Sequence, residues 1–179
     1  MSKKLILSAG LYRSGSTWQF NAIRLILKNS GVSYYSCWEQ DYNPDNPAKY
    51  HLVKVHRFRK TLFNSANYVF TSFRDLDEIK VSMFRRAQLN PRPEFKNETR
   101  YNYISIYILD LLKYQSKSNY LLWFPHIKGQ PKEEIKGMAD VLGLDVDPRK
   151  INIELKTMKV PEEGFDPVTL LHSNHITNK

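Results

Sequence analysis

The stretch GLYRSGSTW, residues 10 to 18, most constrains what this chain can fold into. Gly10 and Gly15 are separated by four residues and followed by two hydroxyl residues. This is the outline of a phosphate-binding loop, in which backbone N–H groups and the positive end of a helix dipole face one anion. A nucleoside triphosphatase would carry a lysine after the second glycine, where this chain has Ser16, and the strong cation is Arg13, inside the loop. The loop therefore indicates an anion site of unspecified ligand, with an ordinary strand-to-helix turn as the alternative.

Short apolar runs alternate with helical patterns along the rest of the chain. The expected strands cover residues 4–9, 33–36, 51–55, 66–73 and 119–124, and the expected helices cover 17–29, 75–89, 99–117 and 131–143. Such alternation predicts an α/β fold in one domain over residues 1–179, with a central parallel sheet of about five strands flanked by helices, as in P-loop NTPases. Three prolines interrupt the chain after residue 145, and no element is assigned there.

The composition limits the partners and the compartment. Lys and Arg number 27 against 18 Asp and Glu, and the net charge of +9 favours an anionic partner such as a nucleotide, an acidic substrate, nucleic acid or a lipid headgroup. Cys37 is the only cysteine, which excludes an internal disulfide and a cysteine-based zinc site. The N-terminal apolar run is short, and no segment approaches the ~20 apolar residues of a membrane helix. We therefore expect a cytoplasmic protein with no membrane partner.

Three segments, in the same order, resemble motifs of the PAPS-dependent sulfotransferases. RSGSTW, starting at Arg13, resembles the family's 5′-phosphosulfate loop P-K-S-G-T-T-W. LVKVH, ending at His56, resembles the K-x-H element that supplies the catalytic base. YVFTSFRDLDEIKVSMF resembles the 3′-phosphate element, a strand that ends in Arg with a serine eight residues later, and Arg74 and Ser82 keep that spacing. The chain thus resembles a small sulfotransferase of the cytosolic type, which implies a P-loop-like fold.

The resemblance implies a cofactor and its binding residues. The cofactor would be 3′-phosphoadenosine 5′-phosphosulfate (PAPS), with 3′-phosphoadenosine 5′-phosphate (PAP) as product and no metal. Residues of the loop and first helical turn would bind the 5′-phosphate, namely Arg13, Ser14, Gly15, Ser16 and Thr17. Arg74 and Ser82 would bind the 3′-phosphate. Trp18 would stack on adenine, although a first-turn aromatic residue is equally typical of a core.

The resemblance also implies three catalytic residues. His56 would accept the proton of a small-molecule acceptor, a hydroxyl or amine, because an unperturbed imidazole with a pKa of ~6.5 is mostly neutral at pH 7. Arg13 would neutralise charge on the oxygen between sulfur and phosphorus. Lys54, two residues before His56 and so on the same strand face, would assist at the sulfuryl oxygens. The other histidines are interpreted as structural: His51, His126, His172 and His175.

The second half of the chain matches the family poorly. Residues 123–126, WFPH, replace an acidic portion of the family's later strand and helix, although Phe124 offers an aromatic face for adenine. The C-terminal R-K-G-x-x-G segment has no clear match, and three residues near the C-terminus are candidates to replace it: Asn174, His175 and Lys179. Loops 38–50 and 86–100 are the expected covers on the acceptor side, because loops at strand ends of α/β sheets usually carry specificity.

Two other functions remain open from the residues alone. A degenerate P-loop kinase or NTPase would fit the loop, but position 16 lacks the lysine and no strand ends in an obvious Asp for Mg²⁺. A non-catalytic nucleic-acid-binding protein would fit the charge, but no nucleic-acid-binding motif is recognisable, so no nucleic acid is expected as partner. The acceptor, the oligomeric state and the role of residues 145–179 are left open.

Overall fold

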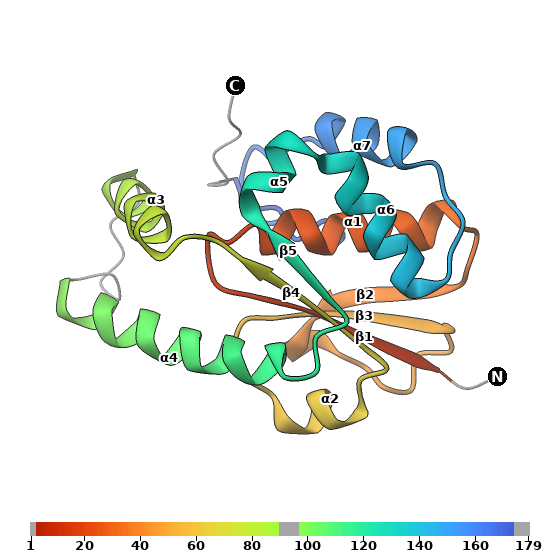
Figure 1. Cartoon of the computed structure of the whole chain (residues 1–179), viewed down its shortest axis with the longest axis horizontal. Helices are drawn as coiled ribbons and strands as arrows, with labels where there is room; N and C mark the ends of the chain where they lie inside the picture. Colours follow the sequence, from red (N-terminus) through yellow and green to blue (C-terminus); the bar gives the residue numbers. More distant parts are fainter. Residues whose placement is uncertain (1–2, 90–96, 174–179) are drawn as a thin grey trace.

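The fold is built on one parallel sheet. The computed structural model describes residues 3–89 and 97–173 (Figure 1). Its five strands lie in the order β2-β3-β1-β4-β5, and all four neighbouring pairs are parallel. The strands are β1 (Lys4–Gly10), β2 (Tyr34–Trp38), β3 (Tyr50–Val55), β4 (Tyr68–Phe73) and β5 (Tyr120–Trp123). The predicted α/β fold with a central sheet of five parallel strands is confirmed.

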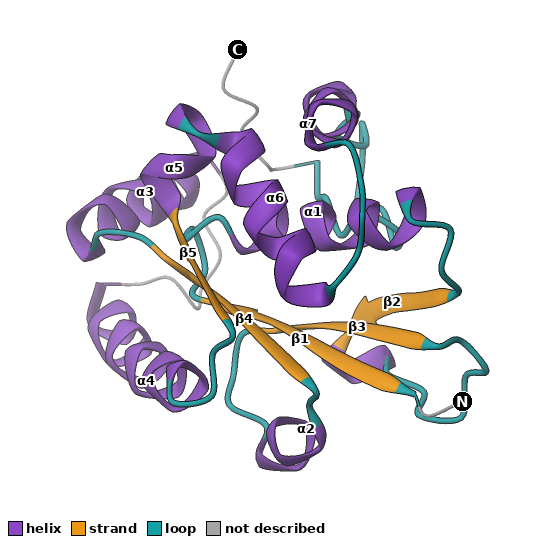
Figure 2. Ribbon diagram, turned by 45° about the vertical axis from the view of Figure 1, so that its right-hand side comes forward, coloured by secondary structure: helices purple, strands orange, loops and turns teal. Residues whose placement is uncertain are grey.

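Helices cover both faces of the sheet. They are α1 (Ser16–Asn29), α2 (Lys60–Ser65), α3 (Leu76–Leu89), α4 (Asn97–Gln115), α5 (Phe124–Gly129), α6 (Pro131–Leu142) and α7 (Pro148–Thr157), with a 3-10 turn, η1, at Glu39–Asp41. Helices α1, α6 and α7 lie on one face and α2 and α4 on the other (Figure 2). No helix among the described residues has the length and apolar character needed to span a membrane.

The core lies on both sides of β1, the middle strand. Ile6 faces a cluster with residues of α1 and α6, while Leu7 faces a second cluster that includes Tyr114 of α4. Both β1 side chains are fully buried. Because successive residues of a strand face opposite sides, a strand covered by helices on both faces must be apolar throughout, as KLILSAG nearly is.

The tail after residue 145 is not irregular throughout, as the sequence analysis supposed, because α7 lies within it. Pro148 occupies the first turn, where its missing N–H costs nothing, and the Asp147 carboxylate accepts a hydrogen bond from the Arg149 N–H. Ile151 is fully buried against the core. Pro148 was therefore interpreted from the sequence as a residue that prevents a helix, whereas it begins α7.

Two short helices also differ from the predictions. The strand expected to include Phe124 ends at Trp123, and Phe124 begins α5. Helix α2 was not expected at all. Each has six residues, less than two turns, so neither shows the helical periodicity on which the prediction relied.

The carboxyl ends of β1, β3 and β4 meet at one edge of the sheet. Gly10 is paired with Ser72, and Ala9 with Val55, so the segments that follow these strands begin at the same level. The glycine loop, His56 and Arg74 each follow one of these strand ends. Parallel strands therefore bring together three segments that are far apart in the sequence.

We expect Gly10→Ala to destabilise the fold by about 1–3 kcal/mol, because a small-to-large change in a tightly packed position forces its neighbours apart. A Cβ at Gly10 would overlap the Ser72 hydroxyl and lie 3.0 Å from both Ser14 Oγ and Ser16 Cβ. Urea denaturation measures the effect. Gly129→Ala is the control, since no atom lies within 4 Å of its added Cβ, and equal stability of the two variants would contradict the prediction.

Candidate functional site

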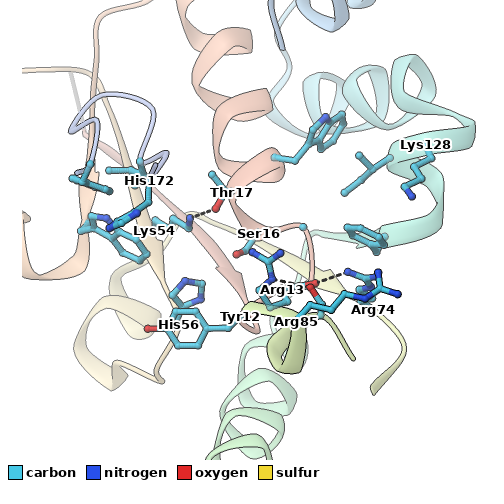
Figure 3. A pocket seen from close by; sticks show the side chains of 18 residues that line it. Tyr12, Arg13, Ser16, Thr17, Lys54, His56, Arg74, Arg85, Lys128 and His172 are labelled. Carbon is cyan, nitrogen blue, oxygen red and sulfur yellow. Dashed lines mark hydrogen bonds between the residues drawn. The ribbon is translucent and has the colours of Figure 1, made fainter. Parts of the chain in front are cut away.

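A cavity of about 520 Å³ opens at the carboxyl edge of the sheet (Figure 3). Its wall includes every site residue predicted from the sequence except Ser14: Arg13, Gly15, Ser16, Thr17, Trp18, Lys54, His56, Arg74 and Ser82. Cations gather along this wall, and none of the described residues that line the cavity is acidic. The structure thus brings the three motifs into one cavity, whose charge suits an anionic ligand.

The glycine loop presents uncapped amide groups to the cavity. Gly15 is the N-cap of α1 in the left-handed region (φ 87°), and no side chain caps the helix. The first intrahelical bond runs from the Gln19 N–H to the Gly15 carbonyl, so the N–H groups of Ser16, Thr17 and Trp18 precede the helical ladder. The helix also carries no acidic residue in its first turn. An anion at this position would meet free donors and the positive end of the helix dipole.

Ser14 has a different place from its neighbours. Its hydroxyl is fully buried, donates to the Leu11 carbonyl over 2.7 Å and lies 2.8 Å from the Ser72 hydroxyl. Its N–H donates to the same Leu11 carbonyl over 3.3 Å. Both donors of Ser14 are therefore used inside the loop and not on the cavity, and the contact between the Ser14 and Ser72 hydroxyls joins the loop to β4.

Lys54 is a buried cation on the central part of the wall. Its side chain is 1% exposed, its ammonium donates to Thr17 Oγ1 over 2.6 Å, and it lies 4.6 Å from the centre of the Trp38 ring. Burial lowers the pKa of Lys54 to about 7. The ammonium has a hydroxyl and an aromatic face beside it, so a bound anion would supply the charge that these neutral groups lack.

His56 is held in one tautomer. Its Nδ1 lies 2.6 Å from the Gly10 carbonyl oxygen, which can only accept a hydrogen bond, so Nδ1 carries the proton and Nε2 keeps its lone pair. The ring packs against Tyr12 (centroids 4.0 Å apart) and Trp38 (5.2 Å). Burial first, and then the charge of Lys54, lower the pKa of His56 to about 3, against the effect of the Gly10 bond. The imidazole is therefore neutral and has a free proton-accepting nitrogen.

The segment after His56 is tied to α4. The Asp110 carboxylate accepts from Arg57 Nε over 2.7 Å and from the Phe58 N–H over 3.0 Å. Tyr114 donates from its hydroxyl to the Arg57 carbonyl and accepts from the Arg59 N–H, both over 3.0 Å. These bonds fix the backbone directly behind His56.

Arg13, Arg74 and Ser82 form a connected group at the other end of the cavity. Arg13 Nε donates to Ser82 Oγ over 2.9 Å, and Arg74 donates to the Arg13 carbonyl over 3.2 Å. Arg74 also pairs with Glu78 at 2.8 Å, and its guanidinium carbon lies 3.9 Å from the centre of the Phe124 ring. Phe124, considered for adenine from the sequence, thus lies under Arg74, and Trp18 both lines the cavity and packs on the core.

Several lining residues lie outside the set of binding and catalytic residues predicted from the motifs. They come from the strand ends, from α3 and α5, and from the C-terminal segment: Tyr12, Trp38, Arg85, Ile127, Lys128, Phe165, Leu170 and His172. His172 had been interpreted as structural, yet it lines the cavity (Figure 3). Trp38 stands at the start of the expected cover 38–50, whereas residues 90–96 of the other cover lie outside the described residues.

The C-terminal segment returns to the cavity through specific contacts. Asn21 of α1 donates to the Thr169 carbonyl over 2.7 Å, and Phe165 pairs with His172 in an antiparallel bridge. This segment places Phe165, Leu170 and His172 on the wall. The candidates to replace the family's C-terminal motif, Asn174, His175 and Lys179, lie outside the described residues.

Two other predicted features have clear places. His51 is buried, with its ring nitrogens 3.1–3.2 Å from the Tyr42 hydroxyl and from the carbonyls of Asn46 and Ala48, so it fits the structural role assigned to it. In the part of the chain that the structure describes, no group of three or more His, Cys, Asp or Glu residues is arranged to hold a metal ion.

Comparison with known proteins rests on structure. The sequence matches no protein-family model and has no significant match among curated proteins. The fold is similar to retinol dehydratase in complex with androsterone and the inactive cofactor PAP, with a TM-score of 0.60, 13% identity and 87% of this chain covered. It is also similar to retinol dehydratase bound to retinol and PAP, with a TM-score of 0.58, 15% identity and 89% covered. The chain therefore shares its fold with these PAP-bound structures.

The extent of this similarity is limited in two ways. At 13–15% identity the likeness shows the fold alone. The chain also spans 65% of the length of both retinol dehydratase chains. The activity, the ligands and the roles of individual residues are therefore matters for proposal.

We expect Lys54→Met to change how stability depends on pH. The pKa of Lys54 is about 7 in the folded protein and 10.5 in the unfolded chain. Between these pH values the unfolded chain holds a proton on Lys54 that the folded protein has lost. This group therefore makes the free energy of unfolding rise with pH. The variant lacks this rise. Urea denaturation of both proteins at several pH values measures this difference. Parallel pH profiles of the two proteins would contradict the lowered pKa of the buried Lys54.

Proposed function

We propose that the chain is a sulfotransferase that moves a sulfuryl group from PAPS to a hydroxyl or amine of a small-molecule acceptor. The observation that carries the proposal is the cavity that joins an uncapped helix N-terminus, the cations Arg13, Lys54 and Arg74, and a neutral His56. These groups offer what sulfuryl transfer needs: a binding site for an anionic donor, positive charge beside the reacting oxygens, and a base. We infer that this reaction takes place in the cytoplasm.

The donor would lie along the wall with its two ends on different groups. The N–H groups of Ser16, Thr17 and Trp18 are the donors available to its 5′-phosphate, and Arg74 with Ser82 would bind its 3′-phosphate. Ser14 would support the loop from behind, because its own donors are used inside it. Trp18 is available to adenine.

The transfer would form one bond and break another. The acceptor oxygen attacks sulfur while the bond between sulfur and the bridging phosphate oxygen breaks, which leaves PAP and a sulfate ester. The proton of the acceptor hydroxyl passes to Nε2 of His56, and Arg13 and Lys54 stabilise the charge on the leaving and sulfuryl oxygens. A pKa of about 3 would make His56 a weak base, but the negative charges of a bound donor favour the protonated ring and raise its pKa.

The contact between Lys54 and Thr17 favours this reaction over that of a P-loop kinase or NTPase. In an NTPase the hydroxyl at this loop position binds Mg²⁺. Here the hydroxyl of Thr17 accepts a hydrogen bond from a buried ammonium at 2.6 Å, which puts a protein cation beside it. Lysine thus reaches the phosphate loop from β3 instead of from position 16.

The structural comparisons support the same ligands. PAP is the nucleotide in both retinol dehydratase structures, and retinol and androsterone are the small molecules beside it. Tyr12 and Trp38 pack against the His56 ring, and Phe165 and Leu170 line the same cavity, so these side chains would contact the carbon skeleton of an acceptor. A hydroxyl on an apolar skeleton is therefore included in the first acceptor panel.

We expect the protein to release PAP from PAPS when it is incubated with a panel of phenols, alcohols and sugars. His56→Ala should lower the rate by about 10²- to 10⁴-fold, because a positioned general base contributes that much. Chromatography of PAP measures turnover. Calorimetry with PAP serves as the control, because the variant should still bind it with nearly unchanged affinity. Absence of both turnover and PAP binding in the unaltered protein would refute the proposed function.

A further inference from the structure

Two cations of the cavity wall have no role in the reaction described above. Arg85 belongs to α3 and Lys128 to α5, and both line the cavity together with Arg74. Neither makes a hydrogen bond or ion pair with another residue in the described parts of the chain. Within residues 3–89 and 97–173, then, no described carboxylate neutralises either charge, and no described residue that lines the cavity is acidic.

Helical spacing places both cations at the end of the cavity occupied by Arg74. Arg85 follows Ser82 by three residues and so shares its face of α3, and Ser82 accepts the bond from Arg13. Lys128 follows Phe124 by four residues, one turn along the same face of α5, and the Phe124 ring lies against Arg74. Figure 3 shows Arg74, Arg85 and Lys128 on the side of the cavity opposite His56.

Charge balance shows why Arg74 alone is insufficient there. A phosphate monoester carries about −1.5 to −2 charges at pH 7. The single charge of Arg74 is already shared with the Glu78 carboxylate at 2.8 Å. A doubly charged phosphate at this end therefore needs further cations, and Arg85 and Lys128 are two that pair with no described residue.

We propose that Arg85 and Lys128 complete, with Arg74, a three-cation site for the 3′-phosphate of PAPS and PAP. The inference rests on the proposed function and assigns two binding residues that lie outside the sequence motifs. The three charges come from the residue that follows β4, from α3 and from α5, so they would surround the phosphate from separate segments. They thereby select a nucleotide with two separate phosphates over one that carries only a 5′-phosphate.

The test compares two nucleotides that differ in the 3′-phosphate alone. Calorimetry with PAP and with adenosine 5′-phosphate is performed on the unaltered protein, Arg85→Gln, Lys128→Gln and the double variant. Each single variant should bind PAP about five- to tenfold more weakly, a loss typical of one charge-assisted bond at a partly exposed site, and bind adenosine 5′-phosphate equally well. Lys128→Arg should keep most of the preference for PAP.

Lys132→Gln is the matched control, because Lys132 is an exposed lysine of the adjoining helix α6 that does not line the cavity. Its PAP affinity should equal that of the unaltered protein. An unchanged ratio of PAP to adenosine 5′-phosphate affinity in the double variant would overturn the three-cation site while leaving the proposed function intact. Absence of PAP binding in the unaltered protein would overturn the proposed function and this inference with it.

Discussion

The ammonium of Lys54 is the constraint on which the site depends. It is buried beside a hydroxyl and an indole ring, and none of the described residues lining the cavity is a carboxylate that could neutralise it. Taking a charge out of water without a counter-charge is costly, and the lowered pKa of Lys54 expresses that cost. The same charge lowers the pKa of His56. An anion in the cavity would relieve both effects, so the electrostatics of the site favour anion binding.

The sequence predicts those parts of the fold and of the site that are determined by residues close together in the chain. An apolar run followed by Gly10 and Gly15 identifies a buried strand and its loop because both features depend on neighbouring residues only. The spacing between Arg74 and Ser82 predicted a shared location because a strand end and two helical turns fix their separation. The period of two predicted one strand face for Lys54 and His56; both line the cavity, although β3 ends at Val55, before His56. Parallel strand ends then brought these segments to one edge.

The rest depended on contacts that no local pattern contains. Phe165, Leu170 and His172 reach the cavity because a distant carbonyl, that of Thr169, bonds to Asn21. Arg85 and Lys128 look like ordinary surface cations until the rotation of their helices is known. Ser14 matches the loop motif, yet the chain conformation turns its hydroxyl toward Leu11 and Ser72. The missing information was which distant segments contact one another and how each helix is rotated about its axis. Both are set by packing.

Gly10 joins two functions that are usually assigned to separate elements. Its carbonyl orients the imidazole of His56, and the loop that follows it leads directly into α1, whose first amide groups have no side-chain cap. The positions of the His56 ring and of the α1 N-terminus thus both depend on Gly10. Displacement of the outer helices would alter how ligands enter and leave, whereas the separation between the reacting groups would follow the middle of the sheet. In the proposed reaction, the alignment of His56 with the phosphate-binding groups would thus be set by the middle strand, β1.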